Sequence, residues 1–348
     1  MSDVSTGHAV RVAFRTAVGS AMGLGHLGRC LALAHALRAV AVESFVLLDN
    51  DDRALDLVMT AGFQASQVAC GDDRRATVEC CERLGAGALV VDSYAFSSDD
   101  LRALVAAGRP VIVFDDTADQ ELPVDAVING GAGAARLAYR GSSHTRYLLG
   151  PRYLALGPEF AEAAPRTIHD HVQRALLTIG GADPGRLTAR LARWAIAGLG
   201  AITLDVVVGP LVEDVAAIRE AVRSVPGRVM LHESPKHLYD LMLAADLAIT
   251  GGGHTVYELA ATGTPMVAIC LAENQRLNIE AMRAAGVLEY AGDVHDAALE
   301  PVLMASLATL AADTGRRAEM SQRGRDLVDG RGAARLARAV LDLVRQRR

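Results

Sequence analysis

Hydrophobic positions along the chain follow two spacings that alternate. Short apolar runs, the first at 10–14, have the length of buried strands, and the segments between them carry apolar residues three or four positions apart, as amphipathic helices do. After the first run, this helical pattern consists of Leu27, Leu31, Ala34 and Leu37. Repeated strand–helix units of this kind predict parallel sheets with helices on both faces.

The units form two sets separated by an irregular stretch. Between 141 and 167 the periodicity is lost and three prolines, Pro151, Pro158 and Pro165, interrupt the chain, which is typical of an interdomain connection. We therefore expect an α/β protein with two Rossmann-like domains, 1–165 and 166–348, whose parallel sheets face each other across a cleft, the arrangement called GT-B. The expected strands are 44–48, 67–69, 88–91, 111–114 and 126–128 after the first run, and then 174–179, 202–208, 229–231, 247–250 and 266–271.

Composition excludes several classes of protein. Of the 348 residues, 51% are apolar and 22% are charged, and the net charge of −6 indicates no nucleic-acid-binding surface. No apolar run approaches the roughly 18 residues of a membrane span, and no signal-peptide core is present near the N-terminus, so a cytoplasmic protein is expected. Neither structural zinc nor disulfides are expected, because no Cys-x-x-Cys spacing occurs among Cys30, Cys70, Cys80, Cys81 and Cys270.

Polar residues directly follow several of the strands expected in the first half. Ligands of open parallel sheets bind at the carboxyl ends of the strands, so these side chains are predicted to line one crevice. The residues expected there are Arg15, His26, Asp92, Tyr94, Asp115, Asp116 and Asn129.

A glycine-rich loop, GLGHLGR at 23–29, joins the first strand to the first helix. Its glycines allow backbone N–H groups to approach a ligand, and His26 can exchange a proton near neutral pH. The loop also matches the dinucleotide fingerprint, with Asp49 as the ribose-binding acid, and it could be a purely structural turn. The dinucleotide interpretation is weakened by the segment 15–22, because in that fingerprint the first glycine directly follows the strand.

A second glycine loop, GGGHT at 251–255, directly follows an expected strand and precedes a helix. Its consecutive amides, with Thr255 and His254 as further donors, suit a diphosphate. Glu258 lies on the same side and could accept two ribose hydroxyls, or it could simply favour the helix N-terminus by a few tenths to about 1 kcal/mol. A third loop, containing Gly180 and Gly181, could close on the same ligand or be an ordinary turn.

The sequence contains no motif that clearly indicates a metal or cofactor site. Asp49-Asn50-Asp51 has the spacing that holds a divalent ion on a diphosphate, but it lies in an acidic stretch without a histidine, which favours a solvated loop. No nucleophile elbow, zinc-protease helix or Walker loop occurs. Nucleotide binding is therefore expected to need no metal or cofactor and to depend on backbone amides, helix dipoles and Arg15 or Arg29.

Seven stretches carry a resemblance to a known family: 14–15, 23–29, 91–94, 114–116, 180–183, 251–258 and 272–275. In this order they resemble the PseG family, the UDP-sugar hydrolases of the pseudaminic acid pathway, whose fold is similar to that of the MurG-type GT-B glycosyltransferases. The GxGHxxR and AENQ elements are fairly specific to these hydrolases, whereas the GGxxTxxE element is shared with true transferases.

The resemblance implies hydrolysis of UDP-2,4-diacetamido-2,4,6-trideoxy-β-L-altropyranose to the free sugar and UDP, without a metal. It assigns catalytic roles to His26, Tyr94 and Asn274, with His26 orienting or deprotonating a water. His254 departs from the serine that the family commonly has, which leaves the phosphate contacts and the identity of base and sugar open. The residues expected to bind substrate are Arg15, Gly25, Arg29, Gly180, Gly181, Gly251, Gly252, Gly253, His254, Thr255, Glu258 and Gln275.

Three other functions remain open. A glycosyltransferase of the same fold would pass the sugar to an acceptor instead of water, although no apolar or basic acceptor segment is evident in the first half. An NAD-dependent oxidoreductase would use the first glycine loop. A binding protein without catalysis would not require His26, Tyr94 and Asn274 together.

Overall fold

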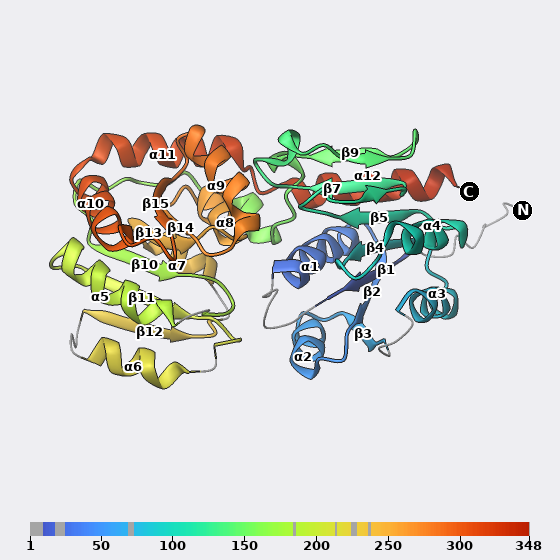
Figure 1. Cartoon of the computed structure of the whole chain (residues 1–348), viewed down its shortest axis with the longest axis horizontal. Coiled ribbons are helices and arrows are strands. Elements are labelled where there is room, and N and C mark those ends of the chain that lie inside the picture. The colour runs from blue at the N-terminus through green and yellow to red at the C-terminus, as the bar shows by residue number, and fades with distance from the viewer. Residues whose placement is uncertain are drawn as a thin grey trace, which may run out of the picture.

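The computed structural model describes residues 10–17, 25–68, 73–183, 186–212, 214–223, 228–235 and 238–347. Two parallel sheets, one in each half of the chain, lie side by side along the long axis of the molecule (Figure 1). None of the helices in these ranges combines the length and the apolar character that crossing a membrane requires. The α/β architecture with two Rossmann-like units is thus confirmed.

The first sheet has seven strands in the order β3-β2-β1-β4-β5-β7-β9, and the two remaining strands of this half, β6 and β8, pair as a separate two-stranded sheet. Its central strands β4 and β5 are buried along their whole length, which explains why they are continuous apolar runs without alternation. The elements are β1 (Arg11–Thr16), α1 (Gly25–Arg38), β2 (Glu43–Leu48), α2 (Asp52–Thr60), β3 (Gln64–Gln67), α3 (Asp73–Leu84), β4 (Ala88–Asp92), α4 (Ser98–Ala106), β5 (Val111–Phe114), β6 (Glu121–Leu122), β7 (Ala126–Asn129), β8 (Arg140–Gly141) and β9 (Arg146–Leu149).

The second sheet has six strands in the order β12-β11-β10-β13-β14-β15. In both sheets the first strand lies in the middle, so the strand order reverses beside β1 and beside β10, and ligands of such sheets bind at these reversals. The elements are β10 (Arg174–Thr178), α5 (Leu187–Leu199), β11 (Thr203–Val208), α6 (Val215–Arg223), β12 (Val229–Glu233), α7 (Leu238–Ala244), β13 (Leu247–Gly251), α8 (Thr255–Thr262), β14 (Met266–Cys270), α9 (Glu273–Ala284), β15 (Glu289–Asp293), α10 (Leu299–Ala312), α11 (Thr314–Leu327) and α12 (Gly332–Gln346).

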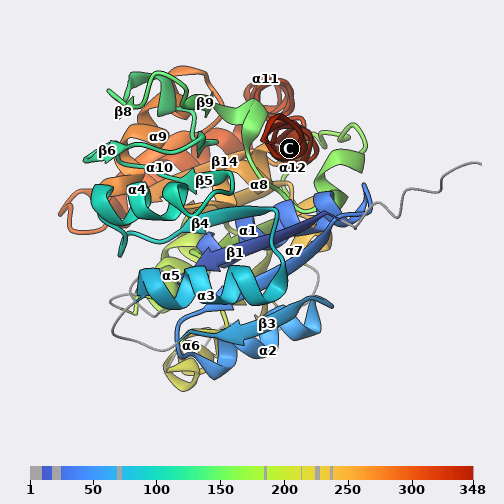
Figure 2. The same ribbon diagram turned by 90° about the vertical axis from the view of Figure 1, so that its right-hand side faces the viewer.

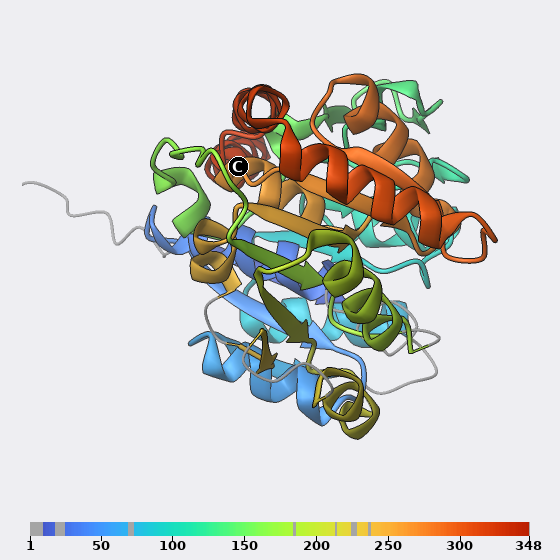
Figure 3. The ribbon, with the colours of Figure 1, turned by 90° about the vertical axis from the view of Figure 1, so that its left-hand side faces the viewer.

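Helices cover both faces of each sheet, as the strand–helix alternation predicts. Viewed from the side of the second half, α5 and α10 lie over one face of its sheet (Figure 3). Their buried side chains, among them Leu191 and Leu303, share a core with Leu177 and Ile249 of the central strands. The four cysteines within the described ranges, Cys30, Cys80, Cys81 and Cys270, are buried free thiols, and Cys70 lies outside those ranges.

Sequence periodicity missed two edge strands. β9 lies within the stretch expected to be an irregular connection, and β15 was not expected at all. Edge strands are covered less than central ones, so they need no continuous apolar run: Arg146 and Tyr147 of β9 are exposed. The strand expected at 67–69 is β3, displaced toward the N-terminus.

The last helix returns to the first half of the chain. α12 lies along α1 and the first sheet, and Figure 2 shows it end-on above β1 and β4. Leu336 and Val340 are buried in the same core as Leu33 and Leu37 of α1. Its start at Gly332 touches the backbone of Leu154 so closely that any Cβ would collide with it. The range 166–348, expected as the second domain, therefore includes a helix that completes the core of the first.

Candidate functional site

His26 lies in the first turn of α1, at the carboxyl end of β1. Its Nδ1 atom is 2.6 Å from Oδ1 of Asp92, the last residue of β4 and a fully buried side chain. A ring nitrogen that donates to a carboxylate leaves the other nitrogen as the proton acceptor. Gly23 and Leu24 of the glycine loop lie outside the described residues, whereas Gly25 begins the helix and lines a cavity beside His26.

Arg29, one helical turn after His26, joins two carboxylates. Its Nε and Nη2 atoms contact the two oxygens of Asp92 at 2.6 and 2.7 Å, and Nη1 is 2.7 Å from Oδ2 of Asp116. Burial by itself would raise the pKa of Asp92, but the charge and hydrogen bonds of Arg29, together with His26, hold that pKa below its ordinary value. Asp92 is therefore a carboxylate throughout the neutral range, ready to accept from His26.

Tyr94 closes this cluster on the side of the solvent. Its hydroxyl donates to Oδ2 of Asp116 at 3.3 Å, and its ring meets the ring of His26 edge-to-face with centroids 5.2 Å apart. Burial of the hydroxyl end and the charge of Asp116 raise the pKa of Tyr94, while the residue as a whole is 43% exposed. Tyr94 is thus a neutral hydroxyl at the rim of the site.

A cavity of about 180 Å³ lies between the two halves and brings these residues together with the second glycine loop. This volume is below the roughly 300 to 1,000 Å³ of ordinary ligand sites. The lining residues are Gly25, His26, Arg29, Phe114, Asp116, Gly130, Gly131, Tyr153, Leu154, Ala155, Gly252, Gly253, His254, Tyr257, Asn274, Gln275 and Asn278.

The second glycine loop faces His26 from the other half of the molecule. Gly252 lies so close to the side chain of Ile279 of α9 that a Cβ there would require this side chain to move. His254 points its Nε2 atom at the carbonyl of Ala155, 3.2 Å away, and burial followed by the charge of Arg29 lowers the pKa of His254 to about 4. His254 is therefore neutral, and its N–H is occupied by a carbonyl rather than free for a phosphate.

Helix α9 supplies amide side chains to the cavity. Asn274 is exposed in its first turn, and the Oε1 atom of Gln275 accepts from the backbone N–H of Leu271 at 3.0 Å. Asn278, which sequence reasoning did not single out, lines the same cavity and accepts from the N–H of Gly133 at 3.1 Å. Its position four residues after Asn274 puts both on one helix face, a signal that was present in the sequence.

Several residues expected to bind substrate lie outside the cavity lining. Arg15 is only 2% exposed, and its guanidinium is bound to Asp73 at 2.8 Å and to Asp49. Asp51 is the N-cap of α2, so neither carboxylate of the DxD stretch is free in solvent. In the described ranges, no three His, Cys, Asp or Glu side chains gather as a metal site would require. The remaining residues outside the lining are Gly180, Gly181, Gly251, Thr255 and Glu258.

Glu258 is partly buried in the first turns of α8. Burial, and then the nearby charge of Glu159, raises the pKa of Glu258 to about 7. The folded protein therefore holds this proton to a higher pH than the unfolded chain does, and stability is lost as the pH rises through the range between the ordinary glutamate value and 7.

Replacing Glu258 with glutamine should therefore stabilise the protein at pH 8 and have little effect at pH 5. The gain at pH 8 is expected to be at most about 3 kcal/mol, the equivalent of the pKa difference. Urea unfolding of both proteins at the two pH values measures it. The control is Glu319→Gln on α11, whose side chain is 70% exposed and should show no such pH dependence. An equal effect of Glu258→Gln at pH 5 and pH 8 would contradict the assignment.

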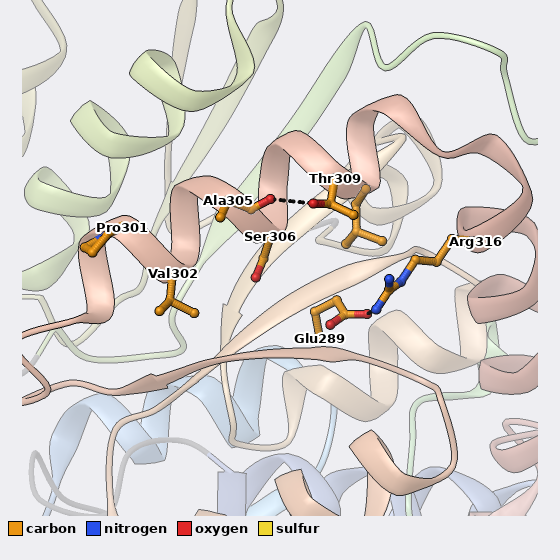
Figure 4. Close-up of a pocket in the computed structure, with 8 residues that line it drawn as sticks. Glu289, Pro301, Val302, Ala305, Ser306, Thr309 and Arg316 are labelled. Atoms are coloured by element: carbon orange, nitrogen blue, oxygen red, sulfur yellow. Dashed lines mark hydrogen bonds and ion pairs between the residues drawn. The ribbon is translucent and has the colours of Figure 1, made fainter.

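A second cavity, of about 370 Å³, lies away from this site, between α10 and β15 (Figure 4). Pro301, Val302 and Ala305 give it a largely apolar wall, and the ion pair of Arg316 with Glu289 lies at one end. None of the residues singled out from the sequence lines it. The candidate residues that line a cavity are therefore found at the one between the halves.

Comparison with known proteins finds distant relatives. No protein-family model matches the chain. An uncharacterized protein of Methanocaldococcus jannaschii is 24% identical over 266 residues, which are 73% of this chain and 54% of that protein. The spore coat polysaccharide biosynthesis protein SpsG of Bacillus subtilis is 26% identical over 240 residues, 68% of this chain and 70% of SpsG. The chain thus spans about half the length of the archaeal relative.

Solved structures match over nearly the whole chain. MurG of Acinetobacter baumannii has a TM-score of 0.66 at 16% identity and covers 95% of this chain and 99% of its own. The calicheamicin glycosyltransferase CalG4 has a TM-score of 0.68 at 15% identity, with coverages of 97% and 99%. The spinosyn rhamnosyltransferase SpnG has a TM-score of 0.65 at 17% identity, and the match covers 94% of this chain and 99% of SpnG. The chain therefore has the GT-B fold, two Rossmann-like domains that face each other across a cleft.

Proposed function

We propose that this protein cleaves the bond between the anomeric carbon and the diphosphate of a nucleotide sugar, and transfers the sugar to a hydroxyl group held at His26. One observation carries the proposal: a His26–Asp92 pair, 2.6 Å apart, faces a glycine loop and a helix N-terminus across the interdomain cavity. The pair is a general base, and the loop suits the departing diphosphate.

In this reaction His26 takes the proton of the attacking hydroxyl. Its Nδ1–H is bound to Asp92, so Nε2 carries the lone pair that accepts this proton. The new C–O bond forms while the anomeric carbon–phosphate oxygen bond breaks, and the electrons of that bond leave with the diphosphate. Asp92 stabilises the imidazolium, and the backbone amide of Gly253, in the second glycine loop that lines the cavity, would bind the negative charge on the leaving group, while the N–H of Gly252 donates to the carbonyl of Ile269 at 2.9 Å.

The comparisons support transfer to an alcohol acceptor over hydrolysis. CalG4 and SpnG are named as a glycosyltransferase and a rhamnosyltransferase, and the Streptomyces glycosyltransferase SsfS6 has been solved with thymidine diphosphate. SpsG is named for polysaccharide biosynthesis. None of these names is that of a hydrolase. A nucleoside diphosphate leaving group is common to both reactions.

Hydrolysis is the second candidate, and the sequence elements around His26 and Asn274 favour it. The GxGH and AENQ elements resemble those of the UDP-sugar hydrolases of the pseudaminic acid pathway, whose substrate carries a diacetamido-trideoxy sugar. Both elements lie at the cavity, since Gly25, His26, Asn274 and Gln275 are among its lining residues. In this reaction a water takes the place of the acceptor hydroxyl.

One experiment separates these functions. The protein, treated with a chelator, is incubated with UDP- and TDP-linked sugars, first alone and then with alcohol or sugar acceptors, and nucleotide release is followed by chromatography. Release only with an acceptor indicates a transferase, and release from an acetamido sugar without one indicates a hydrolase. Thermal stabilisation by NAD but not by UDP or TDP, with no release, would contradict both and indicate an oxidoreductase.

A further inference from the structure

The polar side chains around His26 form a closed ring of contacts. His26 bonds to Asp92, Asp92 to Arg29, Arg29 to Asp116, and Asp116 to Tyr94, whose ring returns to His26. The side chains of Asp92 and Arg29 are 0% and 12% exposed, and that of Asp116 is 25% exposed. Arg29 also lies over the ring of Phe114, 4.9 Å from its centroid. A reaction that used His26 and Asp92 alone would not need the remainder of this ring.

The charges of the side chains in this ring of contacts do not cancel. Asp92 and Asp116 are two carboxylates, Arg29 is one guanidinium, and Tyr94 is neutral, so the cluster carries one excess negative charge while His26 is neutral. When His26 takes a proton, the cluster becomes neutral. In a partly desolvated site the two carboxylates therefore compensate the charge of the imidazolium that forms during the reaction.

We propose that Arg29 and Asp116 are positioning residues for the reaction at His26: Arg29 holds the Asp92 carboxylate in one orientation, and Asp116 supplies the negative charge that balances the imidazolium. This inference rests on the proposed function in taking His26 as the base.

The geometry assigns these two roles to different residues. Arg29 contacts both oxygens of Asp92, a fork geometry that only a guanidinium provides, so it determines where the carboxylate points. Asp116 does not contact His26 through any hydrogen bond found in the described residues, and it acts through its charge and through Tyr94. The two roles predict different kinetic consequences.

Other titratable groups also face His26. Cys30 lies on the same helix as His26, and its Sγ atom is 3.6 Å from Oδ2 of Asp92. Across the cavity, α8 presents His254 and Tyr257, and the segment before the second half presents Tyr153. His254 is neutral at working pH because its pKa is lowered to about 4, by burial first and then by Arg29. The charged side chains of the ring around His26 are therefore Asp92, Arg29 and Asp116, while the buried carboxyl of Asp115, next in the chain to Asp116, accepts from the backbone N–H groups of Thr117 and Ala118.

The variant Asp116→Asn tests the charge. It keeps the size of the side chain and removes one negative charge, so the protonated form of His26 becomes less favourable. The midpoint of the His26 ring titration, followed by NMR in the free protein and assigned with His26→Gln, should move to lower pH by about half a unit or more. The acid limb of the pH–rate profile should move in the same direction. Asp116→Glu, which keeps the charge, should restore both.

The variant Arg29→Lys tests the geometry. It keeps the charge but cannot contact both oxygens of Asp92 and also Asp116, so kcat should fall about tenfold or more while KM changes less than about twofold. The His26 midpoint should shift less than in Asp116→Asn. Matched controls are Asp119→Asn, exposed in the same loop as Asp116, and Arg38→Lys, at the other end of α1, and both should behave as the parent protein.

The NMR titration keeps this inference separate from the proposed function. If the parent protein releases no nucleotide from any sugar donor, the proposed function fails, and the titration in the free protein still decides whether Asp116 controls protonation of His26. An unchanged midpoint in Asp116→Asn, with the protein folded by circular dichroism, would overturn the role of Asp116. A full kcat in Arg29→Lys, or a loss confined to KM, would overturn the role of Arg29.

Discussion

Replacing His26 with glutamine should lower kcat for nucleotide release about 100- to 10,000-fold, the range that loss of a general base produces. Glutamine keeps a polar side chain at the start of α1 but has no basic nitrogen, and the His26–Asp92 contact of 2.6 Å is lost. The affinity for UDP or TDP, measured by calorimetry, should change less than about twofold, because a base acts on the attacking hydroxyl and not on the diphosphate.

The control for this experiment is His144→Gln, the same chemical change at an exposed position in a turn that does not belong to the cavity lining. It should leave both kcat and nucleotide affinity unchanged. Full turnover by His26→Gln, with normal nucleotide binding, would show that His26 is not the base. A loss of nucleotide affinity as large as the loss of kcat would instead place His26 in the binding site.

Replacing Arg317 with methionine should destabilise the protein by about 3 to 5 kcal/mol, a cost typical of leaving buried hydrogen-bonding groups without partners. Arg317 of α11 is 1% exposed. Its guanidinium donates to the carbonyls of Leu310 and Ala311, at the end of α10, at 2.5 and 2.8 Å. It also donates to the carbonyls of His169 and Asp170, at 2.6 and 3.1 Å, in the segment before β10.

The free energy of unfolding in urea measures this effect. Methionine preserves most of the aliphatic volume, so the loss reports the hydrogen bonds rather than a cavity. The control is Arg323→Met on the same helix, whose side chain is 54% exposed and pairs with Glu319 at 3.3 Å, and which should cost less than about 1 kcal/mol. Equal free energies of unfolding of the two variants would show that the hydrogen bonds of the buried Arg317 guanidinium do not stabilise the fold.

The strand–helix alternation was readable from the sequence because central parallel strands must be apolar on both faces. β4 and β5 are fully buried, and their short continuous apolar runs, separated by helical patterns, predicted buried strands. The edge strands β9 and β15 lack this signal, since one side of each has no neighbouring strand in the sheet. The return of α12 to the first half was not predictable either, because an amphipathic helix shows that it packs but not on what.

For the site, the sequence identified which residues follow strands, but not which of their side chains contact one another at the cavity. His26, Tyr94 and Asn274 do line or border one cavity, as strand ends in such sheets allow, while Arg15, at the end of β1, turns toward Asp49 and Asp73 instead. A buried guanidinium binds the nearest carboxylates, and that choice depends on residues distant in the chain. The spacing from Asn274 could have indicated that Asn278 faces the same cavity, but its hydrogen bond with the backbone of Gly133 in the other half could not be read from the sequence.

The sequence by itself determined the α/β class, the two-domain plan and the positions of the glycine loops, because hydrophobic period and backbone freedom are local properties. Tertiary structure alone decided the closed ring around His26, which joins α1, β4 and the loop after β5, and decided that His254 gives its N–H to Ala155. The physical reason is that charge balance and hydrogen-bond pairing depend on distances between side chains, and these distances are defined only once the sheets and helices have packed.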